Sequence, residues 1–127
     1  MARARKSGIT WETIRQLAMA LPETEEGTSY GTPAFRVRGK LFVRLHQDGD
    51  CVVIPMDLEE RTMRMRADPQ AFFITDHYVR YPYMLVRFAA VGKDVIRELL
   101  EDAWRRFAPS RLIAALDNLK PQRGDSQ

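Results

Sequence analysis

The sequence lacks the features that mark secreted and membrane-spanning proteins. It has one cysteine, Cys51, so no disulfide can form within the chain, which fits a reducing compartment. No apolar run approaches the ~20 residues that a membrane-spanning helix needs. The basic residues 1–8 lead into no apolar segment, so they do not resemble a secretory signal. We therefore expect a cytoplasmic protein that has no membrane partner.

The chain also lacks the spaced residues of a catalytic or metal site. No CxxC or HxxxH pair is present, and His46, Asp48 and Asp50 cluster at an expected hairpin turn, where aspartate is favoured for turn chemistry alone. Asp76 beside His77 suggests a carboxylate orienting a general base, but adjacent residues seldom orient each other in that way. No serine or cysteine is placed as a nucleophile. We expect no enzyme activity, no metal and no cofactor.

The length and charge of the chain indicate one domain with an almost neutral body. The chain has 127 residues, of which 45% are hydrophobic and 29% charged, as in ordinary soluble domains. The net charge is +3, but five basic residues and one acidic residue lie in the terminal segments 1–8 and 120–127. We expect these segments to be disordered tails around a single domain at 9–119. The overall charge therefore gives little support to nucleic-acid binding by the folded body.

Apolar periodicity predicts four helices, at about 11–21, 58–66, 93–107 and 109–118. Thr10 is a suitable N-cap for the first helix, and Pro22 ends it. In the second helix, Leu58, Thr62 and Met65 are expected to face inward. The third helix has the clearest apolar stripe. It begins at Ile96, and its other members lie three, four, seven, eight and eleven residues further along the chain.

Five strands are expected, at about 34–37, 41–47, 51–54, 71–75 and 83–89, with an acidic loop at 23–29. The Asp-Gly-Asp sequence at 48–50 predicts a hairpin, because glycine tolerates positive φ. The order α-β-β-β-α-β-β-α-α predicts an α+β fold of two layers, with helices on one face of an antiparallel five-stranded sheet. The other face of the sheet would be open to water or to a partner.

The residues from 30 to 46 alternate between apolar and basic side chains. Neighbouring residues in a strand point to opposite faces, so one face of this hairpin would be apolar and the other cationic. The residues expected to point inward are Phe35, Val37, Leu41, Val43 and Leu45. Those expected to point outward are Arg36, Arg38, Phe42, Arg44 and His46, joined by Tyr83 and Arg87 from the last strand.

Five short phrases occur in a fixed order along the chain. They are Leu-Pro-Glu at 21–23, Tyr-Gly-Thr-Pro-Ala-Phe at 30–35, Gly-Lys-Leu-Phe at 39–42, Phe-Phe-Ile-Thr-Asp-His-Tyr at 72–78 and Arg-Phe-Ala-Pro-Ser-Arg-Leu at 106–112. By their order and spacing the chain resembles the MmcQ/YjbR family of small bacterial proteins over about residues 11–119. The resemblance implies a secretion-chaperone-like α+β fold with a five-stranded antiparallel sheet. It also implies DNA binding, and it carries over no catalytic residues.

The candidate binding surface combines guanidinium groups with aromatic rings, which suits phosphates and unpaired bases. Its predicted members are Arg36, Arg38, Lys40, Phe42, Arg44, His77, Arg80 and Arg87. The alternative is a solvated sheet face whose charges discourage aggregation. The loop at 75–83, rich in tyrosine, is either a recognition loop or packing over the sheet edge.

Two functions of different classes remain at this point. The first is nucleic-acid (DNA) binding through the basic and aromatic sheet face, without catalysis. The second is a module that binds a protein partner or a small ligand, and the neutral body favours it. An enzyme would need a deep pocket near His77.

Overall fold

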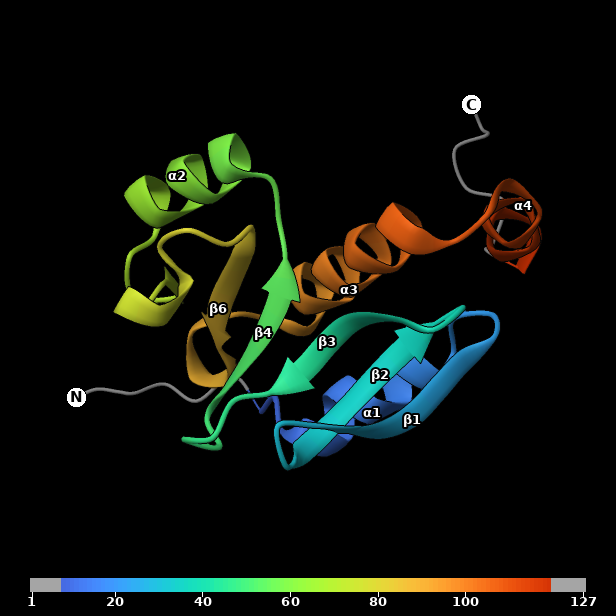
Figure 1. Ribbon diagram of the computed structural model, residues 1–127, viewed down its shortest axis with the longest axis horizontal. Coiled ribbons are helices and arrows are strands. Elements are labelled where there is room, and N and C mark those ends of the chain that lie inside the picture. The colour runs from blue at the N-terminus through green and yellow to red at the C-terminus, as the bar shows by residue number, and fades with distance from the viewer. Residues whose placement is uncertain (1–7, 120–127) are drawn as a thin grey trace.

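The computed structural model describes residues 8–119. The predicted tails therefore lie, apart from Gly8, outside the described residues. The described chain forms an α+β fold, as predicted, in which an antiparallel sheet packs against helices (Figure 1). The α-helices are α1 (Trp11–Met19), α2 (Leu58–Ala67), α3 (Lys93–Phe107) and α4 (Ser110–Leu119). Two short 3-10 helices are η1 (Asp76–Tyr78) and η2 (Phe88–Ala90).

The sheet of the described chain has six strands rather than the predicted five. They are β1 (Thr24–Ser29), β2 (Thr32–Val37), β3 (Lys40–Leu45), β4 (Cys51–Pro55), β5 (Phe72–Phe73) and β6 (Tyr83–Arg87). Their order across the sheet is β1-β2-β3-β4-β6-β5, and all neighbouring pairs are antiparallel. The additional strand is β1, whose polar sequence Thr-Glu-Glu-Gly-Thr-Ser suggested a loop. Polar and charged residues suit it, because β1 is an edge strand with one neighbour.

Two tight turns connect the first three strands. Tyr30–Gly31 joins β1 to β2, and Arg38–Gly39 joins β2 to β3. Both residues of each turn have positive φ, at 53° and 80° in the first turn and 53° and 81° in the second. Two-residue hairpin loops with positive φ at both positions are type I′ turns, whose twist matches that of the strands. Glycine is at ease in this conformation, whereas the tyrosine and the arginine are strained.

The main core lies between the sheet and the helices α1 and α3, which are behind the strands in Figure 1. Ile14 and Ala18 of α1 are buried, and so is the predicted stripe of α3 from Ile96 to Trp104. Trp104 is fully buried and donates its ring N–H to the carbonyl oxygen of Pro22 at 3.1 Å. Thr10 caps α1 as predicted, by accepting from the backbone N–H of Thr13 at 3.4 Å.

A β-bulge in β3 changes which side chains point inward. Phe35 pairs with Val43, but the next residue, Arg36, pairs with Leu41, so Phe42 is an additional residue in β3. Phe42 and Val43 are both fully buried in the main core. The prediction that Phe42 points outward and contacts nucleic acid is therefore wrong. Leu41, which was expected to point inward, lies beside Arg36 outside the main core.

The opposite face of the sheet is partly covered. A second cluster of buried side chains forms there over β4 and β6, and η1 packs on it through Tyr78. Its buried members are Cys51, Val53, Tyr78 and Leu85. The expected open outer face is thus restricted to the part of the sheet that η1 does not cover.

Arg61 of α2 holds the segment around η1 in place. Arg61 is 8% exposed, and its guanidinium donates to the carbonyl oxygens of Tyr78, Val79, Tyr81 and Tyr83 at 2.7–3.1 Å. Of the residues expected on the inner face of α2, Met65 packs against the main core as predicted. The prediction is wrong for Leu58, which is 51% exposed, and for Thr62, and the buried residue of the helix is Arg61. The apolar pattern of the helix gives no indication that an arginine is buried and bound to four carbonyl oxygens.

Replacing Arg61 by leucine tests this role. The variant Arg61→Leu leaves four carbonyl oxygens without their donor, so we expect the free energy of unfolding to fall by about 3 kcal/mol. Arg66→Leu, on an exposed part of the same helix, is the matched control and should change it by less than about 0.5 kcal/mol. Urea denaturation monitored by tryptophan fluorescence measures both. Equal effects of the two substitutions would contradict the anchoring role.

Cys51 provides a second test, because it lies in the cluster under η1. Burial, assisted by the charge of Asp50, raises the pKa of the Cys51 thiol to about 12. The thiol therefore stays protonated at pH 7–9, and the thiolate is the reactive form. We expect alkylation by iodoacetamide at pH 8 to be at least about 100-fold slower in the folded protein than in urea. Similar rates in the two states would contradict the burial of Cys51.

Candidate functional site

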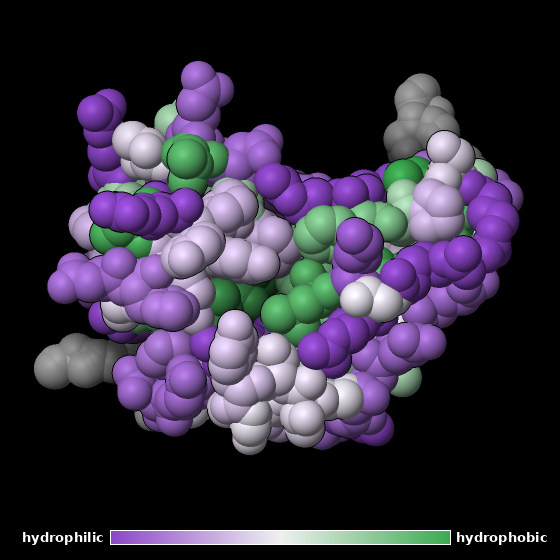
Figure 2. Space-filling model, viewed as in Figure 1, coloured by the Kyte–Doolittle hydropathy of each residue, from purple (hydrophilic) through white to green (hydrophobic). Residues whose placement is uncertain are grey.

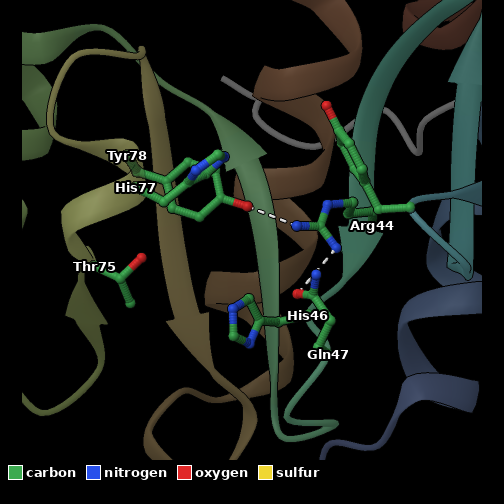
Figure 3. A pocket seen from close by; sticks show the side chains of 7 residues that line it. Arg44, His46, Gln47, Thr75, His77 and Tyr78 are labelled. Atoms are coloured by element: carbon green, nitrogen blue, oxygen red, sulfur yellow. Dashed lines mark hydrogen bonds between the residues drawn. The ribbon is translucent and has the colours of Figure 1, made fainter.

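A cleft of about 220 Å³ lies on the face of the sheet that η1 partly covers (Figure 3). Four segments that are distant in the sequence contribute to it: the β1–β2 turn, β3, the β3–β4 hairpin and the stretch around η1. The lining residues are Tyr30, Arg44, His46, Gln47, Thr75, His77 and Tyr78. Figure 2 shows mostly hydrophilic side chains on the face turned to the viewer, with a group of apolar side chains near its middle.

Arg44 forms the floor of the cleft. Its cross-strand neighbours are Ala34 and Val53, and only 4% of it is exposed. Nη2 donates to the hydroxyl of Tyr78 at 2.6 Å, and Nη1 lies 3.3 Å from the hydroxyl of Thr32. Nη1 is also 3.2 Å from the backbone oxygen of residue 45 and 3.5 Å from the side-chain oxygen of residue 47.

The charge of Arg44 has no carboxylate partner among the described residues. All its acceptors are neutral oxygens, and no ion pair to it lies within 4.0 Å. The Nε–H and the second N–H of Nη2 have no acceptor in the described chain. A buried cation is costly unless it is paired, so an anion that reached these N–H groups would gain a strong, charge-assisted interaction.

Tyr30 forms one side of the cleft mouth. The Cζ atom of Arg44 lies 5.2 Å from the centre of the Tyr30 ring, a cation–π distance. The tyrosine is nevertheless 80% exposed, and its backbone has a φ of 53° that bulky residues rarely adopt. A large aromatic ring at a strained and exposed turn position is a candidate for ligand contact.

Both histidines of the chain line this cleft. Nδ1 of His46 accepts from the backbone N–H of Asp48 at 3.2 Å, so the neutral ring carries its proton on Nε2. The carboxylate of Asp48 lies 3.5 Å from the same Nδ1. His77 is exposed, and its ring makes an edge contact with Tyr78, with 4.7 Å between the ring centres.

The lining of the cleft is rich in donors and contains no carboxylate. Arg44 supplies a fixed positive charge, the two imidazoles supply N–H groups, and Thr75 and Tyr78 supply hydroxyls. Such a set of groups can bind an anion with several oxygen atoms, of which phosphate is the obvious example. In the part of the chain that the structure describes, no three histidine, cysteine or acidic side chains lie close enough to hold a metal ion.

The predicted binding residues do not form one patch. Arg44 and His77 meet in the cleft, but the other members lie elsewhere. Arg38 is 3.8 Å from Glu23, and with Lys40 it lies at the β2–β3 turn. Arg87 lies in β6 opposite Cys51, away from that turn, where it packs on the ring of Phe73 at 3.9 Å and donates to a backbone oxygen.

Arg36 and Arg80 complete the predicted set. Arg36 is half-buried and pairs with Leu41, so it is the basic residue of β2 that shares the outer face with Arg44. Arg80 is exposed just after η1. Glu26, which faces the same hairpin from β1, is bound by Arg15 at 3.1 Å. The ion pair of Arg38 with Glu23 thus compensates part of the basic stripe, whereas Glu26 is bound by Arg15 outside it.

The cleft contains residues to which the sequence pattern assigned no binding role, Tyr30 and Gln47. It also contains Thr75 and Tyr78, which the sequence placed in a loop that was either for recognition or for packing. Only one local signal was available, a bulky tyrosine before a glycine where a tight turn usually has asparagine or aspartate. The meeting of η1 with β3 is a tertiary feature that no local pattern indicates.

The chain is similar to known bacterial proteins. A family model described as YjbR matches residues 19–106. The uncharacterized proteins Rv2570 of Mycobacterium tuberculosis and Mb2600 of Mycobacterium bovis are each 26% identical to this chain over 121 residues. Each of these matches covers 84% of this chain and 94% of the relative.

A solved structure shares the fold. It is the crystal structure of protein DR2400 of Deinococcus radiodurans, described as a DUF419 domain, with a TM-score of 0.67 and 18% sequence identity. The match covers 85% of this chain and 88% of that chain. Within the described residues, no helix is both long and apolar enough to cross a membrane.

The strained turn of Tyr30 gives a test that separates a structural role from a binding role. Tyr30→Asn relieves a left-handed conformation that costs about 1–2 kcal/mol for a bulky residue, and it loses a cation–π contact worth about 0.5–1 kcal/mol. We therefore expect the free energy of unfolding to stay level or to rise by up to about 1 kcal/mol. Arg38→Asn, at the same position of the next turn, is the matched control. A fall of more than about 1 kcal/mol for Tyr30→Asn alone would mean that the ring is structural.

Proposed function

The chain belongs to the YjbR family, and on that premise we propose that it binds nucleic acid, taking an unpaired segment of a strand at the cleft between Tyr30 and Tyr78. The family resemblance supports a DNA ligand. The cleft supports a particular mode of contact, in which a phosphate meets Arg44 and a base stacks on Tyr30. The proposed function involves no chemical step.

One observation carries the proposal: a buried guanidinium without a carboxylate partner lies beside an exposed aromatic ring. Arginine donors bind phosphate oxygens through strong, charge-assisted bonds. Stacking of a base on an aromatic side chain contributes about 1–3 kcal/mol and tolerates any base. Arg44 and Tyr30 are adjacent, so consecutive parts of one nucleotide can reach both of them.

The geometry favours a single strand over a duplex. Arg44 is 4% exposed, so a phosphate must enter the cleft to reach it, and the phosphates of a duplex are held on a broad cylinder. Duplex binding also relies on a basic stripe across several phosphates. Here Arg38 is paired with Glu23, and Arg87 is held against the ring of Phe73 and by a backbone oxygen.

A small anionic ligand is the second candidate. The cleft, at about 220 Å³, is smaller than the ~300–1,000 Å³ of typical ligand pockets, so it suits one group of a ligand. The near-neutral body of the chain also fits this candidate, because small ligands do not need an extended basic surface.

Fluorescence anisotropy with a labelled ten-nucleotide oligothymidylate tests the proposal. We expect binding of the single strand and at least about tenfold weaker binding of the matching duplex. Only one or two phosphates enter the cleft, so the affinity should fall less than about tenfold between 50 and 200 mM salt. A basic stripe contacting six or more phosphates would lose about a thousandfold or more.

The same assay identifies the site. Arg44→Gln should weaken binding by about tenfold or more, because a charged hydrogen bond is lost. His77→Ala, at an exposed residue of the cleft, should also weaken it. Arg97→Gln, on the exposed side of α3, removes the same charge away from the cleft and should leave affinity unchanged. Circular dichroism confirms folding of each variant. Absence of single-strand binding, or equal losses for all three variants, would refute the proposal.

A further inference from the structure

The shape of the cleft affects whether an internal or a terminal phosphate of a strand can enter it. Its walls come from separate segments, with Tyr30 of the β1–β2 turn on one side and the η1 segment on another. The β3–β4 hairpin contributes His46 and Gln47 as a further wall, and Arg44 forms the floor (Figure 3). An internal phosphodiester continues into a nucleotide on both sides, so both neighbours would have to leave through the mouth of the cleft. A terminal phosphate is joined to a nucleotide on one side only, so only one neighbour has to leave through the mouth.

The free donor groups of the cleft suit a phosphate that presents several oxygen atoms. Arg44 offers its Nε–H and one N–H of Nη2. The hydroxyl of Tyr78 accepts from Arg44, so its own hydrogen is free to donate. His46 directs Nε2–H away from Asp48, which occupies its Nδ1. A diester presents two free oxygens and one negative charge, whereas a monoester presents three oxygens and almost two charges at neutral pH.

No negative charge in the lining of the cleft opposes a doubly charged phosphate. No carboxylate lines the cleft, and Asp48, the acidic group closest to the imidazole of His46, lies on the Nδ1 side. Tyr30 lies at the mouth and is 80% exposed, so its ring can stack on the base of the nucleotide whose phosphate is bound.

On these grounds we infer that the cleft recognises a terminal phosphate monoester, the phosphorylated end of a single strand, rather than an internal phosphodiester. Arg44, His46 and Tyr78 bind the phosphate oxygens, and Tyr30 stacks on the terminal base. The inference rests on the proposed nucleic-acid function and names the part of the strand that the cleft selects.

Three ten-nucleotide oligothymidylates with an internal label test this selection. One carries a 5′-phosphate, one a 3′-phosphate, and one ends in hydroxyls. We expect one phosphorylated oligonucleotide to bind about tenfold or more tightly than the hydroxyl form, because additional charge-assisted bonds form. His77→Ala and Tyr30→Asn should weaken binding of this oligonucleotide, and Arg44→Gln should remove the preference. Arg97→Gln should change neither the affinity for this oligonucleotide nor the preference for it.

The outcomes separate the inference from the proposed function. Equal affinity for all three oligonucleotides overturns the selection of strand ends and leaves nucleic-acid binding in place. No binding of any of them overturns the proposed function, and the inference falls with it. Thymidine 5′-monophosphate, added as a competitor, distinguishes a strand end from a free nucleotide. It should compete more weakly than the preferred oligonucleotide, and equal competition would overturn the assignment to a strand end.

Discussion

The hydrogen bonds of the buried Arg44 guanidinium are the interaction on which the site depends. They connect β3 with the start of β2 through Thr32, with the β3–β4 hairpin through Gln47, and with η1 through Tyr78. Neutral oxygens accept hydrogen bonds from part of the guanidinium, and its charge has no carboxylate partner in the described chain. One residue thereby assembles the walls of the cleft and provides its attraction for anions. The two roles are compatible because the guanidinium has five N–H groups in a fixed plane.

Two features outside the cleft determine where Arg44 and its partners lie. The bulge at Phe42 shifts the alternation of β3, so that two consecutive residues enter the core and Arg44 follows on the opposite face. Arg61 fixes the segment around η1 by donating to its carbonyl oxygens, which places the hydroxyl of Tyr78 at 2.6 Å from Arg44. The cleft therefore depends on a local irregularity in one strand and on a second buried arginine in α2.

The sequence allowed much of the fold to be predicted, and less of the site. The apolar stripe of α3 and the Thr10 cap are local features, and both were recognised. The strand β1 was missed because its residues are polar, and an edge strand needs no apolar pattern. The bulge was missed because one additional residue leaves no trace in an alternating sequence, and this alone reversed the orientation assigned to Phe42. The meeting of Tyr30 with the η1 segment follows from tertiary packing, so only part of the cleft, Arg44 and His77, was among the expected binding residues.

The central claim is that the uncompensated charge of Arg44, rather than the scattered surface arginines, receives the ligand. An NMR titration of the ¹⁵N-labelled protein with a phosphorylated ten-nucleotide strand tests it most directly, by following arginine Nε–H and imidazole resonances. The account predicts that Arg44, His46 and His77 shift together and saturate with one dissociation constant, while Arg38 and Arg87 stay unchanged. Shifts confined to Arg38, Arg80 and Arg87, with the cleft resonances unmoved, would contradict it.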